Sequence, residues 1–384
     1  MVWQMAKQGK KKTTFSKVIG MLLSIVVIIA CVYFKIGDVD DLIPTLESLL
    51  NSDLIVESTA KPTEIPSNNE KADSNYTADS LEVYFFDVGQ ADAILLLTAD
   101  KAMLVDTGNA GDADVSDKIK DKINLTHELK RLGVERIDVL VATHPHEDHM
   151  GSAYKIVNTF DIGNIYVTAY DEKFSKNYYD CFWEAVQEKD VHVISPTTLS
   201  ENEIKAKIDE YNAGVENKSE KIVYNDNDYI RLGDSFKFGN ATVTMIAPAS
   251  SEYSDTNDYS IVFMVEFEGV KLLLTGDSGK KAEEETLEFA KKTGFDLDAD
   301  ILKVGHHGSR TANTEAFIDA VSPEYAIIMV EEGNSYGLPD EDVIERLQKH
   351  NAIIYSTMEH GDIKLLINDG TYKFDFSYDH EVKE

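Results

Sequence analysis

The chain contains few cysteines and few basic residues for its length. Only two of its 384 residues are cysteine, so it cannot form a disulfide framework or a cysteine-rich zinc finger. Lysine and arginine number 37 against 69 acidic residues, and the net charge of −32 argues against a protein that binds nucleic acid over a broad basic face. Hydrophobic residues make up 43% of the chain, which excludes disorder over its whole length.

The charge is unevenly distributed along the chain. Residues 1–35 contain six of the 37 basic residues and no acid, so the remainder has a balance of −38. Residues 18–34 are uncharged, have no polar face and are just long enough to span a membrane. We expect 1–17 to be a basic cytoplasmic segment and 18–34 a transmembrane signal anchor in a single-pass protein of the cell membrane. The basic start would then keep the rest of the chain outside the cytoplasm.

Two other interpretations of the apolar segment stay open. Cleavage as a signal peptide would make the protein secreted, although no clear cleavage site follows the run. Residues 28–31 (Ile-Ile-Ala-Cys) resemble the lipobox of bacterial lipoproteins, with Cys31 as the lipidated residue, although the apolar run continues to Phe34. The composition of 57–80 is typical of a flexible linker, so 35–80 is expected to be a stalk. It would precede a domain at 81–378 and a tail at 379–384.

From Leu81 onward, short apolar runs alternate with segments of helical spacing. Residues 200–227 are the exception, because they are polar and irregular and predict an insertion or a mobile loop. Strand-rich halves with interspersed helices indicate sheets covered by helices. Strands are expected at 81–88, 91–98, 101–108, 137–143, 163–168, 191–195, 235–247, 259–267, 270–275, 301–304, 325–330, 352–357 and as a pair within 362–377. Helices are expected at 115–132, 151–159, 175–188, 279–293, 314–320 and 340–349.

Five of the ten histidines fall in two short clusters, each directly after an apolar run. The first, residues 143–149 (Thr-His-Pro-His-Glu-Asp-His), offers three imidazoles and two carboxylates, groups that suit Zn²⁺, with Mn²⁺ or Fe as lesser options. The second, residues 303–309 (Lys-Val-Gly-His-His-Gly-Ser), could supply one more ligand. Between them an apolar run ends at Asp277, an acid that could bridge two cations.

These motifs have a recognisable arrangement. His-x-His-x-Asp-His, then Thr-Gly-Asp, then His-His-Gly-Ser, each behind an apolar strand, resembles the metallo-β-lactamase superfamily. The runs at 86–93 (Phe-Asp-Val-Gly-Gln-Ala-Asp-Ala), 104–109, 257–260 and 334–337 are similar to its ComEC-type branch, which includes the extracellular domain of competence proteins. Surface phosphorylcholine esterases look similar too. The resemblance covers 81 to about 378 and implies an α/β protein with a four-layer αββα sandwich and two divalent metal ions where the sheets meet.

The resemblance also implies roles for individual residues. Asp148 would be both a ligand and a catalytic residue that orients the attacking hydroxide, and His306 would either face the substrate as a catalytic residue or pack beside the site. Asp106, together with Asp87, would orient the ligand histidines. The implied metal ligands are His144, His146 and Asp277 for one ion, and Asp148, His149, Asp277 and His307 for the other.

The sequence departs from the family pattern at two places. A further metal-ligating histidine, common in the superfamily between the first cluster and Asp277, has no clear counterpart, and His192 in that interval is expected to be structural. Leu338 stands where the ComEC-type pattern commonly has histidine, which puts nuclease activity in doubt.

The predicted function is that of a membrane-anchored extracellular phosphodiesterase that uses a hydroxide bound to two ions, Zn²⁺ first and Mn²⁺ second. Its substrate would be a phosphorylated cell-envelope component, a choline ester or a nucleic acid fragment. No broad nucleic-acid surface is expected, although basic residues close to the motifs could form a local patch. A ComEC-like nuclease and a non-catalytic surface module that retains the fold are the alternatives. The basic residues near the motifs are Lys280, Lys281, Lys303 and Arg310.

Overall fold

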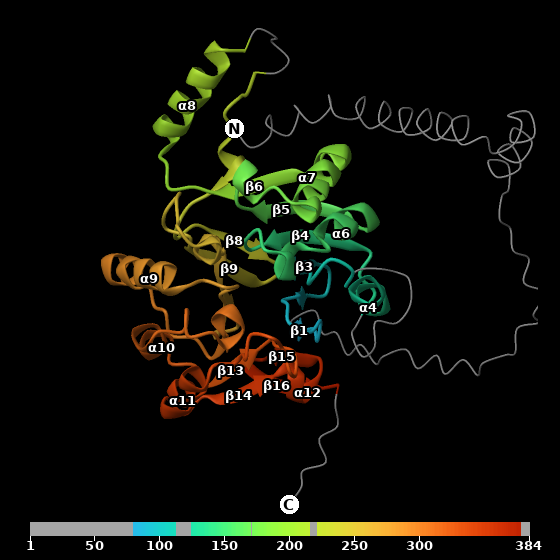
Figure 1. Ribbon diagram of the computed structural model, residues 1–384, viewed down its shortest axis with the longest axis vertical. Coiled ribbons are helices and arrows are strands. Elements are labelled where there is room, and N and C mark those ends of the chain that lie inside the picture. The colour runs from blue at the N-terminus through green and yellow to red at the C-terminus, as the bar shows by residue number, and fades with distance from the viewer. Residues whose placement is uncertain (1–79, 113–123, 170, 216–220, 378–384) are drawn as a thin grey trace, which may run out of the picture. The chain divides into compact units, whose positions relative to one another are not determined.

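The computed structural model describes residues 80–112, 124–169, 171–215 and 221–377 (Figure 1). The predicted cytoplasmic segment, the signal anchor, the C-terminal tail and the stalk up to residue 79 lie outside the described residues. None of the helices in the described ranges is long and apolar enough to cross a membrane.

The strands of the described residues form two sheets. The first sheet has nine strands in the order β16-β15-β1-β2-β3-β4-β5-β6-β7, and the second has seven in the order β14-β13-β12-β11-β10-β9-β8. The first sheet comprises β1 (Ser80–Phe85), β2 (Ile94–Leu97), β3 (Ala102–Val105), β4 (Arg136–Ala142), β5 (Asp161–Val167), β6 (His192–Pro196), β7 (Tyr229–Ile230), β15 (Ile363–Asn368) and β16 (Thr371–Phe376). The second comprises β8 (Ser235–Phe238), β9 (Ala241–Ala247), β10 (Val262–Phe267), β11 (Val270–Leu274), β12 (Ile301–Lys303), β13 (Tyr325–Ile328) and β14 (Ile353–Ser356).

Strands of continuous apolar sequence face a core on both sides, and this explains the layers. In β2, Ile94 and Leu96 pack between the two sheets, whereas Leu95 and Leu97 pack against helices on the other face. In β10 of the second sheet, Phe263 packs between the sheets and Met264 packs against the outer helices. Successive side chains of a strand point to opposite faces, so buried strands of this kind need a cover on both sides.

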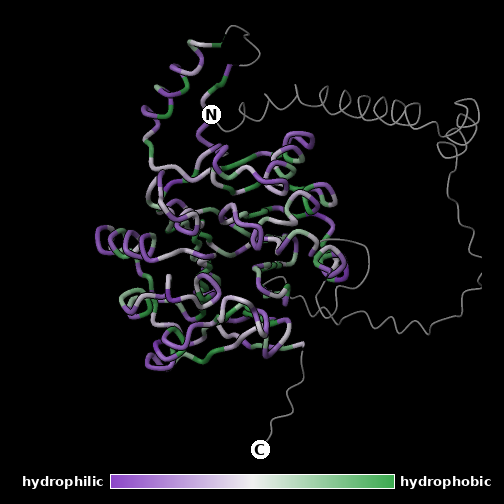
Figure 2. Tube along the Cα trace, viewed as in Figure 1, coloured by the Kyte–Doolittle hydropathy of each residue, from purple (hydrophilic) through white to green (hydrophobic). Residues whose placement is uncertain are grey.

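Helices provide that cover. The first sheet is covered by α4 (Leu125–Arg131), α5 (Glu147–Met150), α6 (Ala153–Thr159) and α7 (Asn177–Lys189). The second is covered by α9 (Lys280–Thr293), α10 (Glu315–Val321) and α11 (Glu341–Lys349), with α12 (Thr357–His360) beside them. The outer turns of α9 and α11 are mostly hydrophilic (Figure 2). The prediction of a mixed α/β protein with helix-covered sheets is confirmed.

Two local predictions were wrong. Residues 201–213, expected to be irregular, form the helix α8 (Glu201–Ala213), which begins with a capping box between Ser200 and Glu203. The single strand expected at 235–247 is a hairpin, because Gly239 adopts φ +54 and turns the chain between β8 and β9. Of the helix expected at 115–132, the described part is α4, and residues 115–123 lie outside the described ranges.

Candidate metal centre

The predicted ligands lie on loops that leave the carboxyl ends of parallel strands. β3 pairs in parallel with β4, and β11 with β12, so in each sheet two neighbouring strand ends point the same way. Asp106 follows β3, the 143–149 cluster follows β4, Asp277 follows β11, and the pair His306-His307 follows β12. Loops at the carboxyl ends of neighbouring parallel strands converge at one edge, which is where ligands bind in such sheets.

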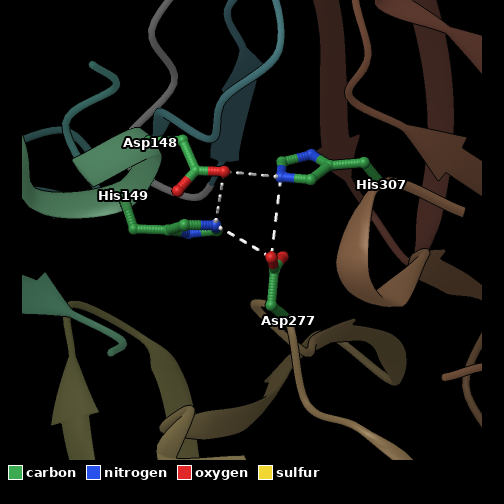
Figure 3. Close-up of side chains that lie close together, drawn as sticks. All are labelled: Asp148, His149, Asp277 and His307. Carbon is green, nitrogen blue, oxygen red and sulfur yellow. Dashed lines mark ion pairs between the residues drawn. The ribbon is translucent and has the colours of Figure 1, made fainter. Parts of the chain in front are cut away.

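Four of these side chains meet at one point: Asp148, His149, Asp277 and His307, here called the central cluster (Figure 3). One ligand atom from each lies within 4.8 Å of the others. Nε2 of His149 is 3.2 Å from Oδ2 of Asp277, and Nε2 of His307 is 3.4 Å from Oδ2 of Asp148. Three members are buried, whereas the Asp148 side chain is 32% exposed, so solvent reaches the cluster on the side of Asp148.

Hydrogen bonds on the far side of each imidazole fix its orientation. Nδ1 of His149 donates to Oδ2 of Asp106 at 2.8 Å, and Nδ1 of His307 donates to the carbonyl of Met329 at 2.8 Å. Both Nε2 atoms and Oδ1 of Asp277 are then buried, and within the described ranges they lack a hydrogen-bond partner of normal geometry. Buried polar atoms are rarely left in this state. Two imidazole nitrogens and two carboxylates directed at one point fit the coordination preferences of a divalent transition metal.

The electrostatics of the cluster are those of a cation site. Burial would lower the pKa of the His149 imidazole, but the carboxylates of Asp277, Asp106 and Asp148 outweigh it and raise this pKa well above its usual value. Burial would raise the pKa of Asp277, but His149 and His307 hold it well below the usual range. The imidazoles therefore carry the compensating protons where no cation is bound, and a cation would displace them.

The other two predicted ligands, His144 and His146, form a pair beside the central cluster. Nε2 of His144 lies 3.0 Å from Nδ1 of His146, and the His144 ring centroid is 4.2 Å from that of His149. Ser260 contacts Nδ1 of His144 at 3.3 Å and accepts the backbone N–H of Asp277 at 3.1 Å. Burial and the nearby His149 lower the pKa of His144 well below its usual value, which keeps this imidazole neutral and available as a ligand.

His306 lies at the edge of the cluster. Its Nε2 is 3.8 Å from Oδ2 of Asp277, while Nδ1 is 2.8 Å from the hydroxyl of Thr311. Its side chain is 26% exposed, in contrast to the buried His307. Both histidines have φ near +50°, a backbone conformation that residues other than glycine seldom adopt. Strain of this kind is found at functional sites, where surrounding contacts hold it in place.

The two acids predicted to orient ligands are placed differently. Asp106 contacts His149 directly and also accepts the backbone N–H of Thr143 at 2.8 Å. Asp87 accepts the backbone N–H of Gly89, and its own N–H donates to Asp362 at 2.8 Å. The acid of that segment that faces the histidines is Asp92, whose Oδ1 lies 3.5 Å from Nδ1 of His307.

Sequence reasoning missed the pair formed by Asp92 and Lys303. Nζ of Lys303 lies 2.5 Å from Oδ2 of Asp92, and both side chains are almost completely buried. Lys303 is therefore part of the interior of the site and not of a surface patch. The available signal was a lysine at the end of a short strand whose other residues are apolar, because an isolated charge is rarely buried.

The remaining residues singled out by sequence lie elsewhere. His192 contacts Asn164 at 2.9 Å and Asp228 at 3.0 Å, in a polar setting on β6. Arg310 forms an ion pair with Asp340, and Lys281 pairs with Glu285 at 3.2 Å. These pairs reduce the positive charge that the 280–310 region could offer to an anionic polymer.

Comparisons with known proteins agree with this geometry. Residues 86–330 match the family described as the metallo-beta-lactamase superfamily. The chain is 25% identical over 295 residues to ComE operon protein 3 of Bacillus subtilis, covering 74% of this chain and 32% of that protein. It is 27% identical over 291 residues to competence protein ComA of Neisseria gonorrhoeae, covering 76% of this chain and 33% of that protein. The chain thus spans about a third of the length of these curated relatives.

Solved structures add a weaker likeness. CmlA, a diiron beta-hydroxylase from Streptomyces venezuelae, is 12% identical with a TM-score of 0.42 over 76% of this chain and 55% of that chain. The family assignment depends on the match at 86–330 and on the competence relatives, and it agrees with the resemblance read from the motifs. The chain belongs to the metallo-beta-lactamase superfamily, in its ComEC-type branch.

Proposed function

We propose that this protein is a metal-dependent hydrolase that cleaves phosphodiesters. The observation that supports this most directly is the central cluster, in which buried imidazole and carboxylate atoms converge and lack hydrogen-bond partners of normal geometry among the described residues. Leaving such atoms unpaired is costly, and coordination of a cation removes that cost. Two divalent ions, when bound, would polarise a phosphoryl oxygen and supply a nucleophile at neutral pH without a serine or cysteine.

Residues of the chain would orient the ligands, accept a proton and contact the substrate. Asp106 and the Met329 carbonyl hold the rings of His149 and His307 so that each Nε2 faces the cluster. Asp148 is the most exposed member of the cluster, and its carboxylate is placed to accept the proton that water loses when it attacks phosphorus. His306 lies at the edge of the cluster, where its Nε2 would contact the substrate.

The substrate we propose is a phosphodiester of a cell-envelope component. The balance of −38 beyond residue 35 and the burial of Lys303 disfavour long nucleic acid. A nuclease acting on DNA fragments is the second candidate, and it is favoured by the similarity to proteins named competence protein ComA and recombination protein 2. A non-catalytic surface module is the third candidate, and metal analysis distinguishes it from both.

The proposed location is the outer side of the cell membrane, with residues 18–34 as the anchor. Lysines are the only charged residues in the segment before the apolar run, and this supports the orientation. Retention in the membrane fraction after alkaline washing, together with protease sensitivity in intact cells, is the expected result. Release into the medium would indicate secretion, and labelling by a fatty-acid analogue that is lost in Cys31→Ser would indicate a lipoprotein.

The decisive experiment measures metal content and hydrolysis on the same preparation of the full-length chain. Bis(4-nitrophenyl) phosphate, short single-stranded DNA and glycerophosphocholine serve as substrates, with Zn²⁺ or Mn²⁺ added. We expect Asp148→Ala and His307→Ala to abolish turnover, while the exposed His127→Ala serves as a matched control and keeps it. Absence of both metal and turnover would refute the enzyme, and unchanged turnover in Asp148→Ala or His307→Ala would refute the site assignment.

A further inference from the structure

A cavity lies at the carboxyl ends of β5 and β6, outside the central cluster. It has a volume of about 260 Å³, just below the range of about 300–1,000 Å³ typical of ligand pockets, and is here called the β5–β6 pocket. One wall is the apolar side of α8, formed by Ile204, Ile208 and Tyr211. Figure 1 shows α8 beyond β6, the strand that pairs in parallel with β5. The carboxyl ends of parallel strands are where ligands bind in sheets of this type.

Two buried hydroxyl groups in this pocket lack a hydrogen-bond partner among the described residues. Thr168, directly after β5, is 8% exposed, and Ser195 in β6 is 3% exposed; both line the pocket. Neither Thr168 Oγ1 nor Ser195 Oγ makes a hydrogen bond within the part of the chain that the structure describes. A hydroxyl can both donate and accept a hydrogen bond, and the large majority of buried side-chain polar atoms make at least one. Two unpaired hydroxyls at neighbouring strand ends therefore point to a ligand with polar atoms.

The charged residues that line the pocket indicate which charge the ligand carries. Asp171 pairs with Lys173 at 3.1 Å, so the remaining charged group among the described lining residues is Lys207, which is exposed and also interacts with Glu203 one turn earlier on α8. The ammonium of Lys173 lies 4.7 Å from the ring centroids of both Phe174 and Tyr259. A cation of the chain itself therefore already occupies the faces of these two aromatic rings, which could otherwise receive a quaternary ammonium.

We propose that the β5–β6 pocket binds an amphipathic organic anion, namely an aromatic or aliphatic body that carries one carboxylate or phosphate. The body packs against Ile204 and Ile208 of α8. Polar atoms of the ligand bond to the hydroxyls of Thr168 and Ser195, and the positive charge of Lys207 favours an anion over a cation. This site goes beyond the proposed hydrolysis and does not depend on it.

The pocket is adjacent to the metal centre along the chain. Tyr259 lines the pocket and accepts a hydrogen bond from Lys173 at 2.8 Å. The next residue, Ser260, contacts His144 and the backbone of Asp277. Because consecutive Cα atoms are about 3.8 Å apart, the two sites share the 257–260 turn.

The test measures binding to the full-length chain after metal removal with a chelator, so that hydrolysis plays no part. Isothermal titration calorimetry with benzoate and phenyl phosphate is compared with titration by inorganic phosphate and phenyltrimethylammonium. We expect saturable binding of the two organic anions and weaker binding of the other probes. Tighter binding of phenyltrimethylammonium, or no saturation by either organic anion up to millimolar concentrations, would overturn the proposal.

Variants locate the binding in the pocket. Thr168→Val and Ser195→Ala each remove one buried hydroxyl and should weaken binding of benzoate about tenfold, because a hydrogen bond to a charged group is lost. Thr198→Val, at an exposed neighbouring position, is the matched control and should bind as the unaltered chain does. Lys207→Gln should weaken binding of benzoate but not of benzyl alcohol, with the exposed Lys189→Gln as its control. Equal affinities in the Thr168 and Thr198 variants, with circular dichroism unchanged, would refute the assignment.

Discussion

Replacement of Lys303 by methionine is expected to lower the free energy of unfolding by about 3–5 kcal/mol. Lys303 ends β12 with its side chain completely buried, and its ammonium lies 2.5 Å from the carboxylate of Asp92. At an effective dielectric constant near 20, two unit charges at this distance attract by about 7 kcal/mol. Desolvation offsets part of that attraction, so the larger part of the measured loss is the cost of leaving Asp92 buried without its cation.

The pair also connects three loops of the metal centre. Asp92 lies 3.5 Å from His307, and Nζ of Lys303 donates to the carbonyl of Gly276, the residue before Asp277, at 3.4 Å. The Lys303→Met variant should therefore bind Zn²⁺ or Mn²⁺ more weakly as well as unfold more easily. A double variant, Lys303→Met with Asp92→Asn, removes both charges and should regain most of the lost stability, because the negative charge that Lys303 compensated is removed with it.

The assay is urea unfolding of the full-length chain followed by circular dichroism, with and without added metal. Lys205→Met is the matched control, because Lys205 forms an exposed ion pair with Glu201 on α8 and should lose less than about 1 kcal/mol. If Lys303→Met unfolds at the same urea concentration as Lys205→Met, or if the double variant is no more stable than Lys303→Met, the reasoning is refuted.

Three further predictions concern the surroundings of the site. Burial raises the pKa of Glu283 from 4.5 to about 7, so the folded state holds this proton more tightly than the unfolded state does. The resulting contribution, about 3 kcal/mol, is fully present below pH 4.5 and is lost as the pH rises through about 7; Glu283→Gln should flatten this part of a urea-unfolding pH series, and an unaltered slope would contradict the assignment. Gly308 has φ +82, and a Cβ there would lie 2.6 Å from Cβ of Pro339, so Gly308→Ala should cost about 2 kcal/mol or more in urea unfolding. Gly294→Ala, with φ +75 and open space around it, should cost only about 1 kcal/mol, and equal losses would argue against the contact with Pro339. Chelation should lower the melting temperature by about 5–10 °C, readily reversed by metal, since ligand at a hundredfold excess over Kd adds about 2.7 kcal/mol; calorimetry showing no shift would count against a metal centre.

Sequence alone predicted the parts of the fold that depend on local pattern. The strands ending at Ala142, Leu274 and Lys303 could be identified from their short apolar runs, which are typical of strands buried on both faces. The first histidine cluster was informative because its residues are close in sequence and follow such a strand. Asp277 and His307 could be predicted as further ligands only because they follow similar strands and because of the family resemblance.

Other features depend on residues far apart in sequence, and local pattern does not reveal them. Asp92 and Lys303 are 211 positions apart, and nothing in either segment names the other as its partner. The helix α8 was missed for a different reason, since only Ile204 and Ile208 of its side chains are buried and its apolar pattern is weak. Its readable signal was Ser200 followed three residues later by Glu203, a capping box.

The buried charges favour two ions over one. The carboxylates in and directly beside the central cluster belong to Asp92, Asp106, Asp148 and Asp277, and the ammonium of Lys303 leaves three of their negative charges uncompensated. Without ions, protons on the two histidines of the cluster compensate two of these charges.

Ions would displace those protons, so one divalent ion leaves a negative site that repels a phosphodiester, whereas two leave a positive one. We therefore expect turnover of bis(4-nitrophenyl) phosphate by the chelator-treated chain to appear with the second equivalent of Zn²⁺ or Mn²⁺. Turnover that is already maximal at one equivalent, with metal content measured in the same sample, would show that a single ion and the protein charges are sufficient.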